Sequence, residues 1–97
     1  MKNFAVVATI KIELGDRAEY VSALQAHALR CSETEPGTLE FRILVPQDDP
    51  NTVMLYELYS SAEAFQAHLE GASIAQMRAE TSRFKTNLSG IICEQAN

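Results

Sequence analysis

The chain has 97 residues, of which 46% are apolar and 22% are charged, and its formal net charge is −5. This length and composition suit one small globular domain, residues 1–97, whose core buries only about 60–70% of the unfolded surface. The negative charge, without any run of Lys or Arg, argues against a nucleic-acid binder and against attachment to an anionic membrane.

The longest apolar run near the start covers residues 4–10. It is far shorter than the roughly 20 residues that a membrane span requires. Because no basic segment or cleavage site accompanies it, we do not interpret it as a signal peptide. We therefore expect a cytoplasmic protein in which Cys31 and Cys93 stay reduced and serve as small hydrophobic residues.

The first half of the chain predicts a strand followed by a helix. Residues 3–14 are rich in β-branched side chains, and every second residue from Phe4 to Ile12 is apolar, as in a strand with one buried face. Asp16 follows a glycine and is a suitable helix N-cap. From Arg17 to about Thr34 the apolar residues recur at helical spacing.

The second half repeats the pattern with a hairpin inserted. Residues 38–45 alternate as a strand, residues 46–51 are dense in turn residues, and residues 52–60 form the returning strand. Ser60 or Ser61 caps a short helix that Gly71 interrupts. A further helix is predicted from about Ser73 to Asn87, and a last short strand over residues 89–95.

Strand–helix–strand therefore occurs twice, which predicts an α+β, ferredoxin-like fold: a four-stranded antiparallel sheet with its helices on one face. We place five side chains toward the helices, namely Phe41, Ile43, Met54, Tyr56 and Leu58. The opposite face then carries an apolar surface too large for water, comprising Ala5, Val7, Leu44, Val53, Leu55 and Tyr59.

A second copy that packs sheet against sheet would cover that surface, so we expect a homodimer. Glu57 falls on the same predicted face, about opposite Arg42 on the neighbouring strand. We interpret Glu57, Tyr59 and Arg42 as dimer-interface residues, with an interface salt bridge between Glu57 and Arg42. A catalytic carboxylate at Glu57 is the alternative.

Cofactor signatures are absent from the sequence. It contains no G-x-G-x-x-G after a strand, no G-x-x-x-x-G-K-[ST] and no G-x-S-x-G. His27 and Cys31 are four residues apart on the first helix, a spacing that suits two metal ligands, but the remaining His and Cys lie far away in sequence. We therefore expect neither a metal nor another cofactor.

Two histidines remain as candidates for chemistry. His68 lies on the sheet-facing side of its helix, and His27 lies at the edge of the apolar stripe of its own helix. An unperturbed imidazole titrates near ~6.5, so either is a possible base at neutral pH. The alternative for His68 is a packed ring that a backbone carbonyl or a tyrosine satisfies, and for His27 it is an exposed ring.

Residues 35–74 resemble the antibiotic biosynthesis monooxygenase family of small α/β-barrel dimers. The resemblance rests on four features: Glu35-Pro36-Gly37, the Asp49-Pro50 loop, Glu57 followed by Tyr59, and the small-residue helix from Ala64 to His68. It departs from the family pattern at Ser73, where a second histidine is frequent, and at Tyr59, where tryptophan is common. The missing tryptophan argues against the haem-degrading branch.

This resemblance implies a dimeric α/β barrel with a pocket between each sheet and its helices, and a reaction without metal or flavin. We expect a monooxygenase that acts on a quinol-like, anthrone-like or enolisable small molecule and on dioxygen. His68 would be the base, with His27 and Tyr56 orienting oxygens. Phe41, Ile43, Met54, Leu58 and Phe65 would line the pocket. The alternatives are an isomerase of an enolisable carbonyl compound and a non-catalytic ligand-binding or stress-response barrel.

Overall fold

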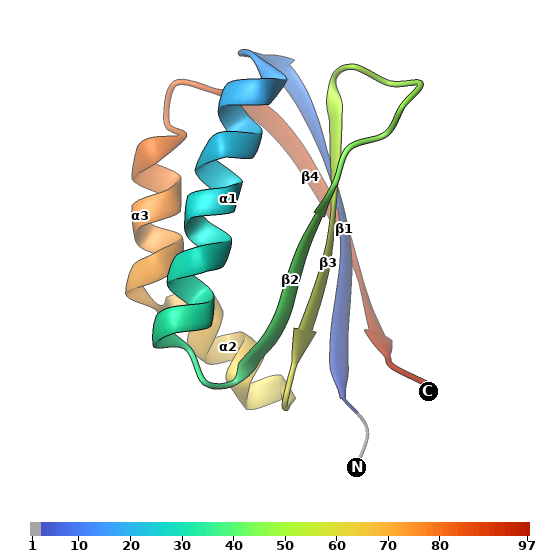
Figure 1. Cartoon of the computed structure of the whole chain (residues 1–97), viewed down its shortest axis with the longest axis vertical. Helices are drawn as coiled ribbons and strands as arrows, with labels where there is room; N and C mark the ends of the chain where they lie inside the picture. The colour runs from blue at the N-terminus through green and yellow to red at the C-terminus, as the bar shows by residue number, and fades with distance from the viewer. Residues whose placement is uncertain (1–2) are drawn as a thin grey trace.

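A computed structural model describes residues 3–97 and arranges them as one sheet with helices on a single face (Figure 1). The strands are β1 (Phe4–Leu14), β2 (Thr38–Leu44), β3 (Thr52–Tyr59) and β4 (Lys85–Glu94). The helices are α1 (Arg17–Thr34), α2 (Ala62–Glu70) and α3 (Ala72–Glu80). The strand order is β2-β3-β1-β4 with every pair antiparallel, which is the predicted ferredoxin-like arrangement.

Local sequence signals place most element boundaries as predicted. The Asp16 side chain accepts a hydrogen bond from the Glu19 backbone N–H and thereby caps α1. The Ser61 side chain does the same for α2, where it accepts from the Ala64 N–H. No helix within residues 3–97 is long and apolar enough to cross a membrane.

The prediction for the last helix was wrong. It was expected to run to Asn87, but α3 ends at Glu80 and residues from Lys85 onward form β4. Phe84, which falls within the predicted helix, instead lies in the connection before β4 and packs edge-on against Tyr20. The physical reason is strand pairing: β1 has a long free edge, and β4 pairs with it from Leu14 down to Phe4, which outweighs the weak helical signal.

The prediction for the faces of β3 was also wrong. Phe41 and Ile43 face the helices as expected, but they lie opposite Glu57 and Leu55 in the register. Because side chains alternate along a strand, Val53, Leu55, Glu57 and Tyr59 share that helix-covered face. Met54, Tyr56 and Leu58 lie on the other face, together with Ala5 and Val7.

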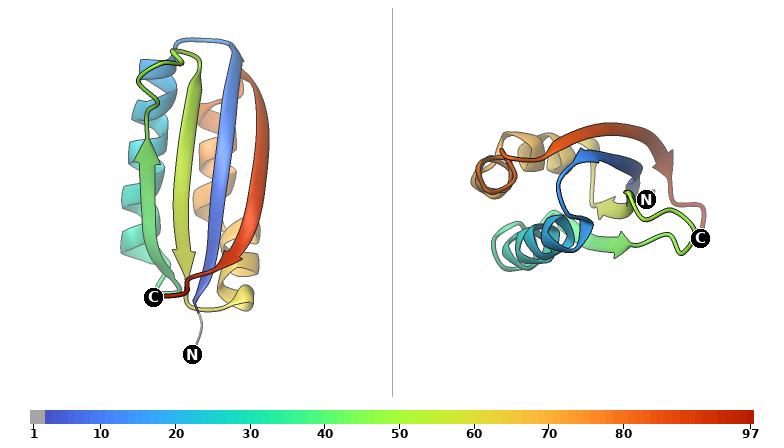
Figure 2. Two further views of the ribbon diagram at one scale, coloured as in Figure 1. Left: turned by 90° about the vertical axis from the view of Figure 1, so that its right-hand side faces the viewer. Right: turned by 90° about the horizontal axis from the view of Figure 1, so that it is seen from above.

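The helices leave that second face uncovered, as the left view of Figure 2 shows. It carries Leu44 and Ile91, whose side chains are 54% and 67% exposed. The helix-covered face instead holds a core of buried apolar residues at the end of the sheet where α1 begins. We call this group the apolar end; it comprises Ile10, Ile12, Tyr20, Leu24, Val53 and Met77.

Candidate active site

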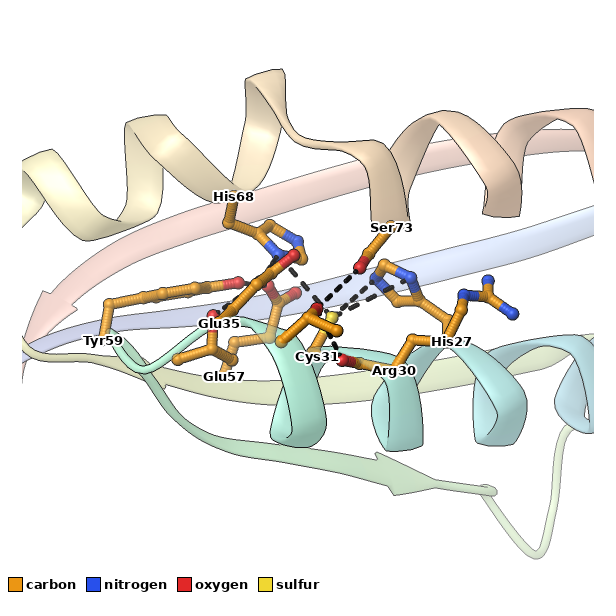
Figure 3. Close-up of polar contacts among 10 residues, drawn as sticks. His27, Arg30, Cys31, Glu35, Glu57, Tyr59, His68 and Ser73 are labelled. Carbon is orange, nitrogen blue, oxygen red and sulfur yellow. Dashed lines mark hydrogen bonds and ion pairs between the residues drawn. The ribbon is translucent and has the colours of Figure 1, made fainter.

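Polar side chains meet at the opposite end of the helix–sheet interface, between the C-terminal half of α1 and the last turn of α2 (Figure 3). The tail of α1 and its C-cap supply three of them, β3 supplies two and α2 supplies one. We call this group the polar cluster; it comprises His27, Cys31, Glu35, Glu57, Tyr59 and His68. All but Glu35 are buried.

The local sequence explains how these groups converge. His27, Cys31 and Glu35 follow one another at intervals of four, so they lie along one side of α1 and its C-cap. Gly37 then lets β2 start close against α2, since a Cβ atom there would lie only 2.6 Å from the Ala64 Cβ. The Glu-Pro-Gly motif thus holds Glu35 within reach of α2.

Glu35 and His68 form a hydrogen-bonded pair. The His68 Nδ1 lies 2.8 Å from the Glu35 Oε1, and the imidazole is only 3% exposed. Thr38 donates a second hydrogen bond to the same carboxylate oxygen at 2.8 Å. Burial would raise the pKa of Glu35, but the hydrogen bonds from His68 and Thr38 keep it below its ordinary value. An ionised Glu35 makes Nδ1 the protonated nitrogen and leaves Nε2 as the acceptor.

Glu57 and Tyr59 form a second pair beside the first. The Tyr59 hydroxyl donates to the Glu57 Oε1 at 2.5 Å, a short distance typical of a hydroxyl bound to a carboxylate. Burial raises the pKa of Glu57, and burial together with the adjacent carboxylate raises the pKa of Tyr59. The pair therefore holds its protons more firmly than the isolated groups would.

The His27 ring projects from α1 and contacts the cavity side of β2. It meets Phe41 edge-on at 5.1 Å between centroids and lies 5.4 Å from the His68 ring. Burial, followed by the nearby His68, lowers the pKa of His27 to about 4, so the ring is neutral at physiological pH. A hydrogen bond to the Ser73 backbone carbonyl opposes that shift.

A cavity of about 530 Å³ runs between the sheet and the helices, a volume sufficient for a small aromatic molecule. His27, Glu57 and His68 line it from the polar cluster, and Tyr20 and Thr86 line it nearer the apolar end. Most of the remaining wall is apolar and includes Val6, Ala8, Leu55, Phe65 and Met77. Among the described residues that line it, Arg78 is the one Lys or Arg side chain.

The structure brings four of the predicted catalytic and substrate-binding residues to this cavity, namely His27, Phe41, Phe65 and His68. Ile43 lies on the same face of the sheet as Phe41 and packs against the apolar end. Because the two faces of β3 are the reverse of those predicted, Met54, Tyr56 and Leu58 point away from the cavity.

The predicted interface residues need a matching correction. Glu57 and Tyr59 belong to the cavity side instead of the uncovered face. Arg42 does lie on the uncovered face, but it pairs with Tyr56 in the register, and its guanidinium lies 3.8 Å from the Glu40 carboxylate. The proposed salt bridge between Arg42 and Glu57 is therefore wrong.

Tyr20 and Glu35 had no predicted role in the site, and Cys31 was predicted to be only a small hydrophobic residue. The spacing of His27, Cys31 and Glu35 was the available signal, since four-residue intervals align groups on one helix side. Nothing in the sequence alone placed His68 against that side, because 33 residues separate it from Glu35.

Solved structures resemble this chain over nearly its whole length. A protein from Nitrosomonas europaea, provisionally described as an antibiotic biosynthesis monooxygenase, superposes with a TM-score of 0.86 at 22% identity, covering 97% of this chain and 90% of its own. SnoaB, a cofactor-independent oxygenase from Streptomyces nogalater, gives 0.86 at 14% identity, covering 100% and 96%. At such identities the likeness establishes the fold.

The sequence itself supplies the family. No curated protein matches it. The family model described as antibiotic biosynthesis monooxygenase matches residues 3–80, which include every member of the polar cluster. The chain belongs to the antibiotic biosynthesis monooxygenase family.

Proposed function

We propose that this chain is a cofactor-independent monooxygenase of a quinol-like or anthrone-like aromatic, with His68 as the general base. Membership of the family gives a monooxygenase-type function at the level of the family. The observation that carries the finer proposal is the His68–Glu35 pair, which sits at the wall of a largely apolar cavity. A carboxylate on Nδ1 orients the ring and leaves Nε2 free to accept a proton.

The proposed reaction requires few groups from the protein. His68 Nε2 takes a proton from the substrate, and the resulting anion transfers one electron to dioxygen, which avoids the spin barrier to direct reaction. Recombination and loss of water leave one oxygen atom in the product as a carbonyl. The protein has to supply a base, donors for the anion and an environment that excludes water.

Tyr20 takes over the orienting role first expected of Tyr56. It lies on the cavity wall, and its hydroxyl is hydrogen-bonded to Thr86. Neutral His27, on the same wall, is the second candidate donor to a developing oxyanion. On the β3 side of the cavity, the hydrogen bond from Tyr59 holds the Glu57 carboxylate in place.

The charge of the cavity favours an aromatic substrate over a phosphorylated one. A phosphate group calls for several cationic donors. Arg78 lines the cavity, whereas Arg42 lies on the other sheet face and Arg83 is hydrogen-bonded to Glu19 at 2.8 Å. This distribution gives less support to an isomerase of a sugar phosphate.

The apolar surface of the uncovered face supports the homodimer as a further part of the proposal. Exposed Leu44 and Ile91 flank half-buried Val7, Met54 and Tyr56 on that face. Two such faces packed together would form the barrel of the family resemblance. Light scattering should give twice the chain mass, Ile91→Asp should lower it to one chain, and Leu29→Asp on α1 should not.

The test of the catalytic proposal is oxygen consumption with a panel of quinols and anthrones. We expect turnover by the wild type and a loss of at least about 100-fold in His68→Ala, because that is the usual contribution of a general base. Gln66→Ala, on the exposed side of the same helix, is the matched control and should retain full activity. Equal oxygen uptake by wild type and His68→Ala would overturn the role of His68, and binding without turnover would favour a ligand-binding barrel.

A further inference from the structure

One buried residue of the polar cluster has no role in the proposed oxygenase reaction. Cys31 lies at the centre of the polar cluster with no solvent exposure, yet no step of the proposed reaction uses a thiol. Two imidazoles approach its sulfur from different helices, His27 from α1 and His68 from α2 (Figure 3). His68 is distant in sequence from His27 and Cys31, which argued against a metal, but the fold brings it beside them.

The sulfur–nitrogen distances are close to those of a tetrahedral zinc site. The Cys31 Sγ lies 3.6 Å from the His27 Nε2 and 3.8 Å from the His68 Nδ1, and donor atoms of the three residues all lie within 4.8 Å of one another. Bonds of about 2.3 Å from zinc to sulfur and about 2.0–2.1 Å to nitrogen, at tetrahedral angles, separate sulfur from nitrogen by about 3.6 Å. The free protein therefore already holds its sulfur–nitrogen spacings close to those of a bound ion.

The surroundings supply a fourth ligand and an outer shell. The Glu35 carboxylate contacts His68 at 2.8 Å and is hydrogen-bonded to the Cys31 thiol. The Ser73 carbonyl accepts a hydrogen bond from the ring of His27, which is the usual outer-shell support for a ligating imidazole. With Cys31 as thiolate and Glu35 as carboxylate, a divalent ion is neutralised by its own ligands, which limits the cost of burying it.

The cavity gives an ion access to the site, and the positive charge beside the site is already paired. His27 and His68 line the cavity, so an ion can reach them through it. The nearby cation that opposes binding is Arg30, and its guanidinium is paired with the Glu80 carboxylate at 3.2 Å.

We propose that His27, Cys31 and His68, completed by Glu35, form a buried site for Zn²⁺. Occupation of the site switches the oxygenase off, a consequence that rests on the proposed function. Zinc on Nδ1 places the remaining ring proton on Nε2, so His68 becomes a hydrogen-bond donor and cannot accept a proton from substrate.

Metal binding is tested apart from activity. The reduced, metal-free chain is titrated with Co²⁺, and Zn²⁺ affinity is measured by competition with a chromophoric chelator. We expect one ion per chain, a thiolate-to-cobalt charge-transfer band and the intense visible absorption of tetrahedral cobalt. Cys31→Ser should remove the charge-transfer band and weaken Zn²⁺ binding by more than about 100-fold, since loss of even an outer-shell partner costs roughly 10- to 100-fold.

Cys93→Ser is the matched control, because Cys93 lies opposite Ala5 on β4, away from the cluster, and should leave both signals unchanged. If Cys31→Ser proves unfolded by circular dichroism, Cys31→Ala and His27→Gln replace it with the same expected loss. Absence of stoichiometric binding by the folded wild type, or equal binding by the Cys31 variants, would overturn the site.

Inhibition is measured separately, as oxygen uptake with and without Zn²⁺. Uptake should fall with the occupancy found by titration, recover with chelator and resist Zn²⁺ in Cys31→Ser. Full uptake by a zinc-loaded wild type would overturn the switch. If the metal-free wild type takes up no oxygen with any substrate, the proposed function fails, and the cobalt and chelator measurements still decide the site.

Discussion

The apolar end and the polar cluster are built on the same elements but satisfy different physical requirements. At the apolar end, α1 and β1 bury Leu24 and Ile10 against α3 and β3, and the contacts are non-directional. At the polar cluster the same α1 buries His27 and Cys31, and β3 buries Glu57. Burial of polar groups is unfavourable unless each finds a partner, and these groups partner one another. The comparison suits a fold in which one end mainly provides apolar packing and the other holds the groups of the proposed reaction.

The largest expected effect is a loss of stability from a substitution at the apolar end. Leu24 is 3% exposed, and Leu24→Ala should lower the free energy of unfolding by about 2–5 kcal/mol through lost transfer energy and a residual cavity. Urea denaturation measures this loss. Leu29→Ala on the exposed side of the same helix is the control and should change stability by less than about 0.5 kcal/mol. Equal losses at the two positions would refute the assignment of the apolar end.

A substitution in the polar cluster should instead reduce activity. Glu35→Gln keeps the shape of the side chain but removes the negative charge that supports His68, so we expect kcat to fall about 10- to 100-fold with KM little changed. Steady-state oxygen uptake measures both constants. Glu33→Gln, exposed near the end of α1, is the control. An unchanged kcat in Glu35→Gln would show that His68 needs no carboxylate partner.

A smaller effect is expected from the second hydrogen-bonded pair. Tyr59→Phe removes the donor to Glu57 and leaves a buried carboxylate without that partner, which should cost about 1–3 kcal/mol at neutral pH. Thermal denaturation is the measurement, and Tyr56→Phe on the uncovered face of the same strand is the control. Equal effects of the two substitutions would mean that the Glu57–Tyr59 hydrogen bond carries no special weight.

The smallest effect sharpens the contrast through its pH dependence. Burial raises the pKa of Glu57 above its ordinary value of 4.5, so the folded state holds this proton to higher pH than the unfolded state does. Its contribution to stability therefore declines as pH rises past 4.5 toward the raised pKa, and then levels off.

Glu57→Gln removes this decline and keeps a side-chain oxygen for the Tyr59 hydroxyl. The variant should match the wild type at acidic pH and become modestly more stable toward neutral pH. Chemical denaturation at a series of pH values measures the difference, with Glu33→Gln as the reference. A wild type that gains stability over Glu57→Gln as pH rises would contradict the assignment.

The sequence predicted the fold where the apolar pattern was one-sided. In the second half of β1 the apolar residues Ala8, Ile10 and Ile12 alternate with polar ones, and α1 begins after the Asp16 cap and ends near Thr34, as predicted. In β3 both sides are apolar, so alternation could not distinguish them, and the predicted facing was wrong. Glu57 is a charged residue on the buried face, and such departures from the usual pattern gather at functional sites.

The candidate site was predictable in part for a related reason. The family resemblance and helical spacing directed attention to His68 and His27, and both lie at the cavity. The partnership of His68 with Glu35 depends on how α2 docks beside the tail of α1, which local pattern does not encode. The extent of β4 likewise depends on the free edge of β1 and not on its own residues alone.

The most direct test of the account is whether His68 removes a proton from a bound aromatic before oxygen reacts. An anthrone is bound to wild type and to His68→Ala under strictly anaerobic conditions, and the absorption of the oxyanion is recorded. We predict the oxyanion spectrum with the wild type and the neutral spectrum with His68→Ala at equal occupancy. The same spectrum from both proteins, whether neutral or ionised, would contradict the assignment of His68 as the base.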